Sequence, residues 1–392
     1  MAICCNLGLS IPHLGLREDR YMAYPKPVMA ATPVFFALIL LLACQPKAVK
    51  SEEPVNAAVA EATPQTKEPI TIAAVGDIMM ASTFPNESRM PPNDGADLLK
   101  DVTPIISAAD IGFGNLEGPI VDGGISTKCA PTSTRCFAFR TPTRYGKYFK
   151  AAGFDLMSVA NNHAGDFGQP GRASTQKVLD EQGIKYAGSL DPMATVAYLT
   201  VRGKQVAMVA FGHNRAMPSI TDLDGARQLV QEADKRADIV IVSFHGGAEG
   251  TGVQHVPFRS EIFLGENRGN LPAFARTVID AGADIVLGHG PHVMRGMEIY
   301  KDRLIAYSLG NFATYGWFQL AGETAMSMVL DAKIDTDGKF LSGKIHSVRL
   351  EGRGIPVLDP TNSSARLVRG LSTADFGTNA PNIGDDGSIS IK

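Results

Sequence analysis

Side chains that can bind metal ions or move protons follow several apolar runs with the length and composition of buried strands. The runs cover residues 70–75, 111–113, 156–159, 239–244 and 285–287. The side chains that follow them are Asp77, Glu117, Asn162, His163, His245, His289 and His292. Because ligands of open α/β sheets collect beyond the carboxyl ends of the strands, we expect these residues to converge on one edge. Together they are typical of a site for one or two divalent metal ions.

Two strings favour this interpretation most. In Asn161-Asn162-His163, Asn162 offers a neutral oxygen ligand, and His163 is a ligand or a general acid that Asp166 orients. The alternative is an Asn-rich turn that only caps the next helix. His289 and His292 lie within one tight turn and are interpreted as metal ligands. Their alternative is a pair of turn histidines that contact the backbone.

The remaining candidates are weaker when each is taken alone. His245 is interpreted as a ligand and Glu249 as a ligand or general base, against a core histidine with a solvated glutamate. Asp77 follows Gly76, which leaves room for an ion, although a turn aspartate that bonds its own backbone has the same pattern. Glu117 is suited to bridging two metals, with the alternative of a polar loop. Asn115 and Asn311 are expected to support the ligands.

The N-terminus reads as a targeting segment. Residues 34–43 are an unbroken apolar run, too short to cross a hydrocarbon core of ~30 Å as a helix. With Lys26 before it and Cys44 after it, the run is typical of a signal peptide. Residues 41–44 resemble a bacterial lipoprotein signal, which implies cleavage before Cys44 and a lipid on Cys44; an uncut signal anchor is the alternative. Residues before Met22 read as upstream sequence.

The resulting expectation is an exported protein of the cell envelope, anchored by lipid, on the periplasmic face of a membrane if the host is Gram-negative. In an oxidising compartment, Cys129 and Cys136 are expected to form a disulfide, with two free thiols as the alternative.

Composition and periodicity indicate one α/β domain. The chain has 392 residues, 44% hydrophobic and 20% charged, with net charge −3, and no basic stripe that would indicate a nucleic-acid partner. Residues 1–44 are assigned to the signal and residues 45–69 to a disordered tether. Strands and helices alternate in the first half of the domain at 70–352, and the second half is β-rich. Two packed sheets with helices outside fit this order. Residues 353–392 are a weakly specified extension.

Six strings in order resemble the CapA family of bacterial capsule (poly-γ-glutamate) synthesis proteins over roughly residues 70–350. They are Gly76-Asp77-Ile78-Met79, Asn115-Leu116-Glu117, Asn161-Asn162-His163, His245-Gly246-Gly247-Ala248-Glu249, Gly288-His289-Gly290-Pro291-His292 and Tyr307-Ser308-Leu309-Gly310-Asn311-Phe312. That family is similar to calcineurin-like metallophosphoesterases. The resemblance implies a four-layer α-β-β-α sandwich with two central mixed sheets.

The resemblance also implies roles. Asp77, Glu117, Asn162, His245, His289 and His292 match metal positions for Mn, Fe or Zn, and His163 matches the acid near the substrate. Metallophosphatases carry a histidine where this chain has Met79, an aspartate where it has Glu117, and a final His-x-His pair. The missing histidine removes a ligand from one metal position, which favours a single-metal site.

Three functions fit these expectations. The leading one is a lipid-tethered protein for synthesis, export or retention of an anionic envelope polymer such as poly-γ-glutamate, with other capsule-synthesis subunits as partners. If the site is active, metal-dependent hydrolysis is the expected chemistry, with His163 or Glu249 moving the proton. An envelope metallophosphoesterase and a non-catalytic polymer-binding scaffold are the alternatives.

Overall fold

The N-terminal signal and most of the tether lie outside the part of the chain that the structure describes. The computed structural model describes residues 68–126, 128–129, 136–191 and 194–392. The predictions for Met22, Cys44 and residues 45–67 therefore fall outside it. The described residues belong to one compact unit. Within the described residues, no helix is long and apolar enough to cross a membrane.

The first sheet is built around β1 (Ile70–Ile78), which pairs in parallel with β2 (Ile111–Leu116) and antiparallel with β14 (Met326–Ile334). Among the described residues its order is β17-β18-β15-β14-β1-β2-β3-β4, with β13 beside β1 and β16 beside β15. The other strands are β3 (Leu156–Ser158), β4 (Lys185–Ala187), β13 (Asn311–Ala313), β15 (Phe340–Glu351), β16 (Ile355–Leu358), β17 (Asn382–Ile383) and β18 (Ser388–Ser390).

The second sheet has the order β11-β12-β10-β7-β6-β5. Its parallel centre consists of β6 (Lys204–Gly212), β7 (Ile239–His245), β10 (Ile285–His289) and β12 (Arg303–Ala306). Its antiparallel edges are β5 (Val196–Val201) and β11 (Met297–Tyr300). A separate hairpin, β8 (Ile262–Phe263) and β9 (Glu266–Asn267), follows β7.

The two sheets pack face to face, and each is covered on its outer face. On β1, Ile72 and Ala74 point into the core between the sheets, whereas Ala73 and Val75 point into the outer core of the first sheet. A strand buried on both faces needs apolar residues at every position, which explains why the strand runs are continuous rather than alternating.

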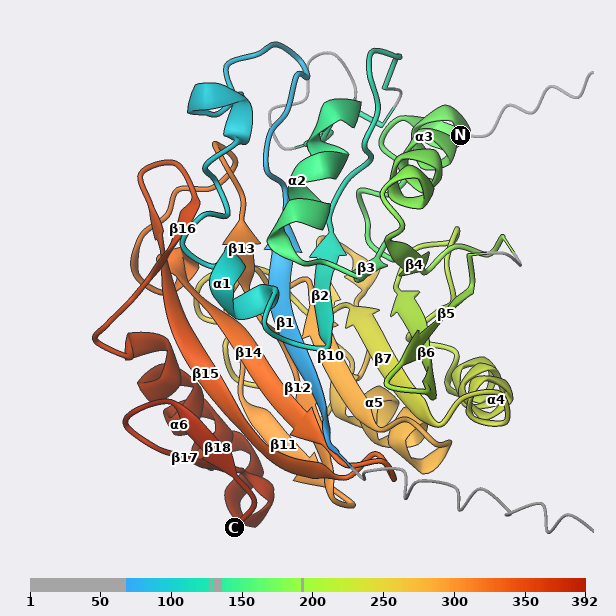
Figure 1. Ribbon diagram of the computed structural model, residues 1–392, viewed down its shortest axis with the longest axis vertical. Helices are drawn as coiled ribbons and strands as arrows, with labels where there is room; N and C mark the ends of the chain where they lie inside the picture. Colours follow the sequence, from blue (N-terminus) through green and yellow to red (C-terminus); the bar gives the residue numbers. More distant parts are fainter. Residues whose placement is uncertain (1–67, 127, 130–135, 192–193) are drawn as a thin grey trace, which may run out of the picture. The chain divides into compact units, whose positions relative to one another are not determined.

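Helices form the outer layers. α1 (Thr103–Ile106), α2 (Gly146–Ala152) and α3 (Gly168–Glu181) contribute to the outer core of the first sheet. α4 (Leu223–Asp234) and α5 (Leu271–Asp280) contribute to that of the second sheet. Figure 1 shows α2 in front of β1 and β2, with α4 and α5 beside β6 and β7. The expected α-β-β-α sandwich with two mixed sheets is confirmed.

Two regions differ from the prediction. Residues 96–109 carry apolar residues at helical spacing, which predicts a helix, but the structure has turns there, followed by the short α1. In these turns the N–H groups of Leu98, Lys100 and Val102 bond the carbonyl three residues earlier. Pro104 has no backbone N–H and so cannot bond the carbonyl of Lys100, which accounts for a helix that begins only at the turn containing Pro104.

The C-terminal extension is also more ordered than expected. α6 (Ser363–Phe376) lies beside β15 and β11 (Figure 1), and short helical turns and strands complete the extension. Ala365 and Val368 enter the central core, and Ser372 Oγ accepts a hydrogen bond from the backbone N–H of Met297 at 2.8 Å. Ala365, Val368, Leu371 and Phe376 form most of its buried face, and the Gly/Asn/Asp/Ser-rich composition of the stretch concealed this helical spacing.

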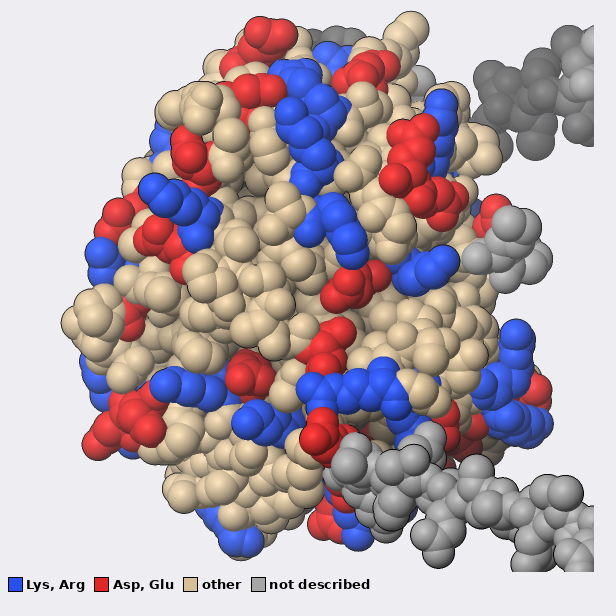
Figure 2. All heavy atoms as spheres, viewed as in Figure 1, with Lys and Arg blue, Asp and Glu red and all other residues tan. Residues whose placement is uncertain are grey.

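The surface shown in Figure 2 carries acidic and basic side chains interspersed, with basic side chains gathered over α2. This face lacks the continuous basic field that nucleic-acid-binding proteins present.

Candidate metal centre

The carboxyl ends of strands from both sheets bring the predicted ligands together. Asp77 lies near the end of β1, and Glu117 directly follows β2. His245 is the last residue of β7, and His292 lies in the loop after β10. Asp77, Glu117 and His292 place ligand atoms within 4.8 Å of one another and form a buried group that is suited to hold a metal ion.

Glu117 is the centre of the site. Its Oε1 lies 3.9 Å from Nε2 of His245, 3.8 Å from Nε2 of His292 and 4.0 Å from Nε2 of His163. These separations exceed hydrogen-bond length but match two ligands that share one cation, since each metal–ligand bond is roughly 2.0–2.2 Å long.

Asp77 and His292 form a closer pair at the same centre. His292 Nδ1 lies 3.0 Å from Asp77 Oδ2 and 3.1 Å from Asn311 Oδ1. His292 has left-handed backbone (φ 58°), an unfavourable conformation for a residue with a side chain, and Asn311 Nδ2 donates to its carbonyl oxygen at 3.1 Å. Backbone strain of this kind persists where surrounding structure enforces it, often at functional sites. Asn115 Nδ2 donates to the other Asp77 oxygen at 2.8 Å.

Burial governs the electrostatics of these groups. Burial raises the pKa of the Glu117 carboxyl well above its usual range, because the nearby His292 only partly offsets the lost hydration. Burial also opposes the charged form of His292, but Glu117 and Asp77 outweigh it and raise the His292 pKa to about 10. Burial also opposes the ionised form of Asp77, but the hydrogen bond and charge of His292, together with His289 and Asn115, outweigh it and lower the pKa of Asp77. Without a cation, Glu117 therefore resists ionisation beside an Asp77–His292 ion pair.

The donor set fits a divalent metal ion. Both Glu117 carboxylate oxygens, Asn162 Oδ1 and His245 Nε2 are buried polar atoms without a hydrogen-bond partner among the described residues. Buried polar atoms are normally paired, so a cluster of unpaired ones indicates a ligand. Burial, aided by His213, also holds the pKa of His245 well below its usual range, and neutral imidazole is the form that binds metal. Mixed nitrogen and oxygen donors suit Mn, Fe or Zn.

His163 is held for proton transfer rather than buried as a core residue. Its Nδ1 lies 2.7 Å from Asp166 Oδ2, and its Nε2 faces Glu117. Burial lowers the pKa of His163, and the hydrogen bond to Asp166 counteracts that shift. The contact expected of Asp166 is present, and it leaves Nε2 directed into the site.

Two residues that the motifs did not identify hold His163 and Asp166 in place. Lys128 Nζ lies 2.6 Å from Asp166 Oδ1 and donates to the carbonyl oxygen of Asn162 at 3.0 Å. The Phe139 ring stacks on the His163 ring with centroids 3.8 Å apart, and the Phe139 N–H donates to Asp166 Oδ2 at 2.8 Å. Lys128 directly precedes Cys129 and Phe139 closely follows Cys136, which would have been the available sequence indication.

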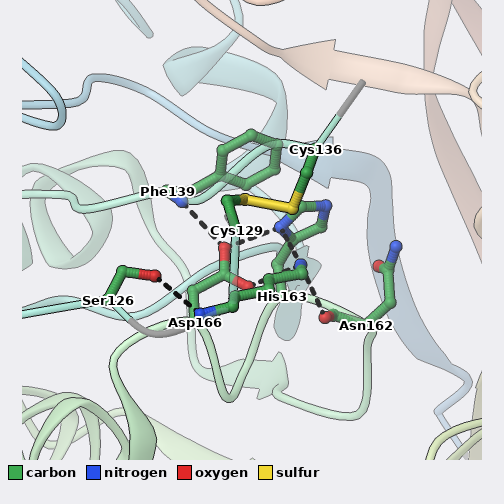
Figure 3. The surroundings of a disulfide bond; sticks show 8 residues. Ser126, Cys129, Cys136, Phe139, Asn162, His163 and Asp166 are labelled. Carbon is green, nitrogen blue, oxygen red and sulfur yellow. Dashed lines mark hydrogen bonds and ion pairs between the residues drawn. A yellow bond between two sulfur atoms is a disulfide. The ribbon is translucent and has the colours of Figure 1, made fainter. Parts of the chain in front are cut away.

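A disulfide lies close to both Lys128 and Phe139. Cys129 and Cys136 are bonded, and Figure 3 shows the bridge next to His163 and Asp166. The cross-link therefore connects the segment that carries Lys128 to the segment that carries Phe139.

The asparagines occupy supporting positions around the ligands. Asn161 Nδ2 donates to Asn115 Oδ1 at 3.2 Å and to the Leu116 carbonyl oxygen at 2.9 Å. Its Oδ1 accepts the N–H of His163 at 3.1 Å. Asn115, Asn161 and Asn311 thus contact the ligands or their neighbours, whereas Asn162 presents an unpaired oxygen.

Two predicted site residues do not join this group. His289 Nε2 lies 3.2 Å from the Val75 carbonyl oxygen, and its Nδ1 lies 3.5 Å from Ser243 Oγ, so both ring nitrogens face protein atoms. Glu249 Oε1 accepts from Arg268 Nη1 at 2.8 Å. Glu249 is thus engaged by Arg268, whereas His163 Nε2 faces Glu117, which makes His163 the better placed of the two predicted proton-transfer residues.

Removing the disulfide tests the support of His163. In Cys129→Ser/Cys136→Ser we expect a loss of about 2 kcal/mol in the free energy of unfolding, because closing a short loop restricts the unfolded chain. We also expect faster amide exchange at residues 161–167, since Lys128 and Phe139 are no longer linked, measured by hydrogen–deuterium exchange.

Lysine variants provide the control for that experiment. Lys128→Met is expected to accelerate exchange in the same segment. Lys177→Met removes an exposed lysine that pairs with Glu181 at 3.8 Å on α3 and is expected to leave the exchange unchanged. Wild-type exchange rates in the double serine variant would contradict the supporting role.

Comparisons with known proteins agree with the motif resemblance. The family model described as "Bacterial capsule synthesis protein PGA_cap" matches residues 71–315. Capsule biosynthesis protein CapA of Bacillus anthracis is 26% identical over 319 residues, covering 76% of this chain and 73% of the relative. PGA biosynthesis protein CapA of Bacillus subtilis is 28% identical over 320 residues, covering 78% and 77%.

Among solved structures, the purple acid phosphatase PPD1 from yellow lupin seeds is similar over 75% of this chain and 53% of its own, with a TM-score of 0.37 and 8% identity. This chain thus spans about half the length of that phosphatase.

Proposed function

The chain belongs to the bacterial capsule synthesis protein family PGA_cap, and on that premise we propose that it binds a divalent metal ion at Glu117 and acts in the synthesis, export or retention of an anionic capsule polymer such as poly-γ-glutamate. The names of the two CapA relatives support the polymer class. The observation that carries the metal site is the approach of His163, His245 and His292 Nε2 to Glu117 Oε1, an oxygen without a hydrogen-bond partner.

The proposed ligands are Asp77, Glu117, His245 and His292, with the Asn162 oxygen as a further donor. A divalent cation supplies Lewis-acid polarisation of a carbonyl or phosphoryl oxygen. His163 is placed to donate a proton to, or take one from, the reacting group through Nε2. Asp166 keeps the ring oriented through Nδ1, so the proton-transfer nitrogen does not turn away.

The proposal includes attachment to the cell envelope. The apolar run at residues 34–43 with Cys44 directly after it supports export and a lipid on Cys44. The tether then lets the domain reach polymer near the membrane surface, where other capsule-synthesis subunits are its proposed partners.

Metal content and polymer content test the proposal together. Protein purified without chelator is expected to contain about one equivalent of Mn, Fe or Zn by mass spectrometry, as a single-metal site requires. Deleting the gene is expected to lower the polymer content of the envelope. A His163→Gln protein should retain metal but restore the polymer poorly. Glu181→Gln, on the exposed face of α3, is the control and should behave as wild type.

The metal site and the capsule role can each be contradicted separately. Protein that neither contains metal nor takes it up on dialysis contradicts the metal site. Unchanged polymer content after deletion contradicts the capsule role, and turnover of a phosphoester panel in that case would favour the envelope phosphoesterase instead.

A further inference from the structure

Two arginines converge on the glycine that precedes the aromatic residues beside the metal centre. At Gly316, an added Cβ would lie 2.8 Å from Arg353 Nη2 and 3.3 Å from Arg89 Cγ. Arg89 Nε donates to the Gly316 carbonyl oxygen at 3.1 Å, and Arg353 Nη1 donates to the Ser88 carbonyl oxygen at 2.8 Å. Backbone carbonyls thus hold two guanidinium groups near each other.

This arginine pair has no acidic partner within the described residues. None of the ion pairs there includes Arg89 or Arg353, whereas arginines such as Arg144, Arg202 and Arg349 contact a carboxylate. Burial and the charge of Arg353 both lower the pKa of Arg89, as expected for like charges held together. An oxyanion that received hydrogen bonds from both groups would relieve this repulsion.

An aromatic surface connects the arginine pair to the metal centre. The Arg89 guanidinium lies over the Trp317 ring, 4.1 Å from its centroid. Trp317 contacts Phe139 with centroids 4.2 Å apart, and Phe139 stacks on His163. The neighbouring Phe318 contacts His292, with ring centroids 4.8 Å apart. Phe139 is buried, whereas Trp317 and Phe318 are partly exposed, so a chain-like ligand that reached His163 would meet the arginines across Trp317 and Phe318.

We propose that Arg89 and Arg353 form a carboxylate-binding subsite for an anionic polymer, with Trp317 as its floor. The subsite receives a side carboxylate of one polymer unit while another unit lies at His163 and Glu117. Planar guanidinium forks suit planar carboxylates, and the aromatic floor suits the aliphatic part of each unit. This inference rests on the proposed function, because the polymer is what links the two places.

The chain contains its own reporter for this subsite. Trp317 is its single tryptophan, so fluorescence excited selectively at tryptophan reports on this position alone. Titrating γ-linked glutamate oligomers into the purified protein is expected to change the emission in a saturable way. Arg353→Gln and Arg89→Gln are each expected to weaken binding by roughly tenfold or more, because each removes hydrogen bonds to a charged group. Calorimetry gives an independent affinity.

Arg236→Gln is the matched control. Arg236, in the loop after α4, also lies over an aromatic ring, 4.6 Å from the centroid of Tyr198 on β5 of the second sheet. It should bind the oligomers as wild type does. Because Arg353 is exposed, its variant tests the subsite even if the half-buried Arg89 proves necessary for folding.

The outcomes separate the subsite from the metal centre. Glu117→Gln should retain the fluorescence response if the subsite exists, whether or not the protein holds metal. Wild-type affinity in the Arg89→Gln/Arg353→Gln double variant, or no response in wild type, would overturn the subsite and leave the metal site standing. Binding of inorganic phosphate or polyphosphate, but not of the glutamate oligomers, would overturn the carboxylate assignment.

Discussion

Glu117→Gln is expected to abolish metal binding while leaving the fold intact. The substitution removes the charge around which the Nε2 atoms of His163, His245 and His292 gather. We expect a loss of metal affinity of at least about 100-fold, more than the loss of an outer-shell partner causes. Mass spectrometry of the purified variant, together with isothermal titration of the added metal, measures the effect.

The same variant should be more stable than wild type without metal. Burial raises the pKa of Glu117 well above its usual range, so the ionised carboxylate costs folding free energy that the neutral amide does not. We expect a gain on the order of 1 kcal/mol, as is common when a strained functional group is replaced. A variant that loses both metal and stability would indicate that Glu117 is structural.

Two histidines supply a matched comparison. His245 and His289 are register partners on β7 and β10, and both are fully buried. Only His245 has a ring nitrogen without a partner. His245→Gln should lose metal, whereas His289→Gln should retain it. Loss of metal in His289→Gln alone would contradict the ligand set.

The second large effect is expected at Arg295, which is fully buried and forms two 2.8 Å bonds with Glu261. Arg295→Met leaves the Glu261 carboxylate buried without its partner. Removing one member of a buried ion pair typically costs about 3–5 kcal/mol, and we expect a loss of that size in the free energy of unfolding by urea titration. Arg349→Met, which removes an exposed partner of Glu351, should cost no more than about 1 kcal/mol.

This ion pair also bears on the metal centre. Glu261 Oε2 accepts the N–H of Ala248 at 3.0 Å, and Arg295 Nη2 donates to the Ala248 carbonyl oxygen at 3.3 Å. The pair therefore fixes the loop after His245, so Arg295→Met should bind metal more weakly as well.

The double variant Arg295→Met/Glu261→Met should regain much of the stability, because apolar residues can replace a buried ion pair. No recovery in the double variant would mean that the cost comes from packing rather than from the unpaired charge.

The strand-end pattern allowed much of the site to be predicted. Continuous apolar runs indicated strands buried on both faces, and the parallel pairing of β1 with β2 and of β7 with β10 then places the residues that follow them on one edge. Asp77, Glu117, His163, His245 and His292 meet there as expected. The motif resemblance supplied the two-sheet architecture, which periodicity alone suggested only in outline.

Other features depended on contacts between distant segments. Whether His289 or His292 turns toward Glu117 depends on backbone angles at the intervening turn, including the left-handed His292. The pairing of Glu249 with Arg268, the approach of Lys128 to Asp166 and the convergence of Arg89 and Arg353 on Gly316 all join residues that no short motif relates.

The sequence by itself determined the fold class, the edge on which the site forms and most residues that compose it, because hydrophobic periodicity and strand direction are local properties of the chain. Only the tertiary structure decided which of those side chains face Glu117, which are neutralised by ion pairs, and which aromatic and basic residues surround them. The orientation of a side chain depends on the packing of every segment that touches it, and these segments come from different parts of the sequence.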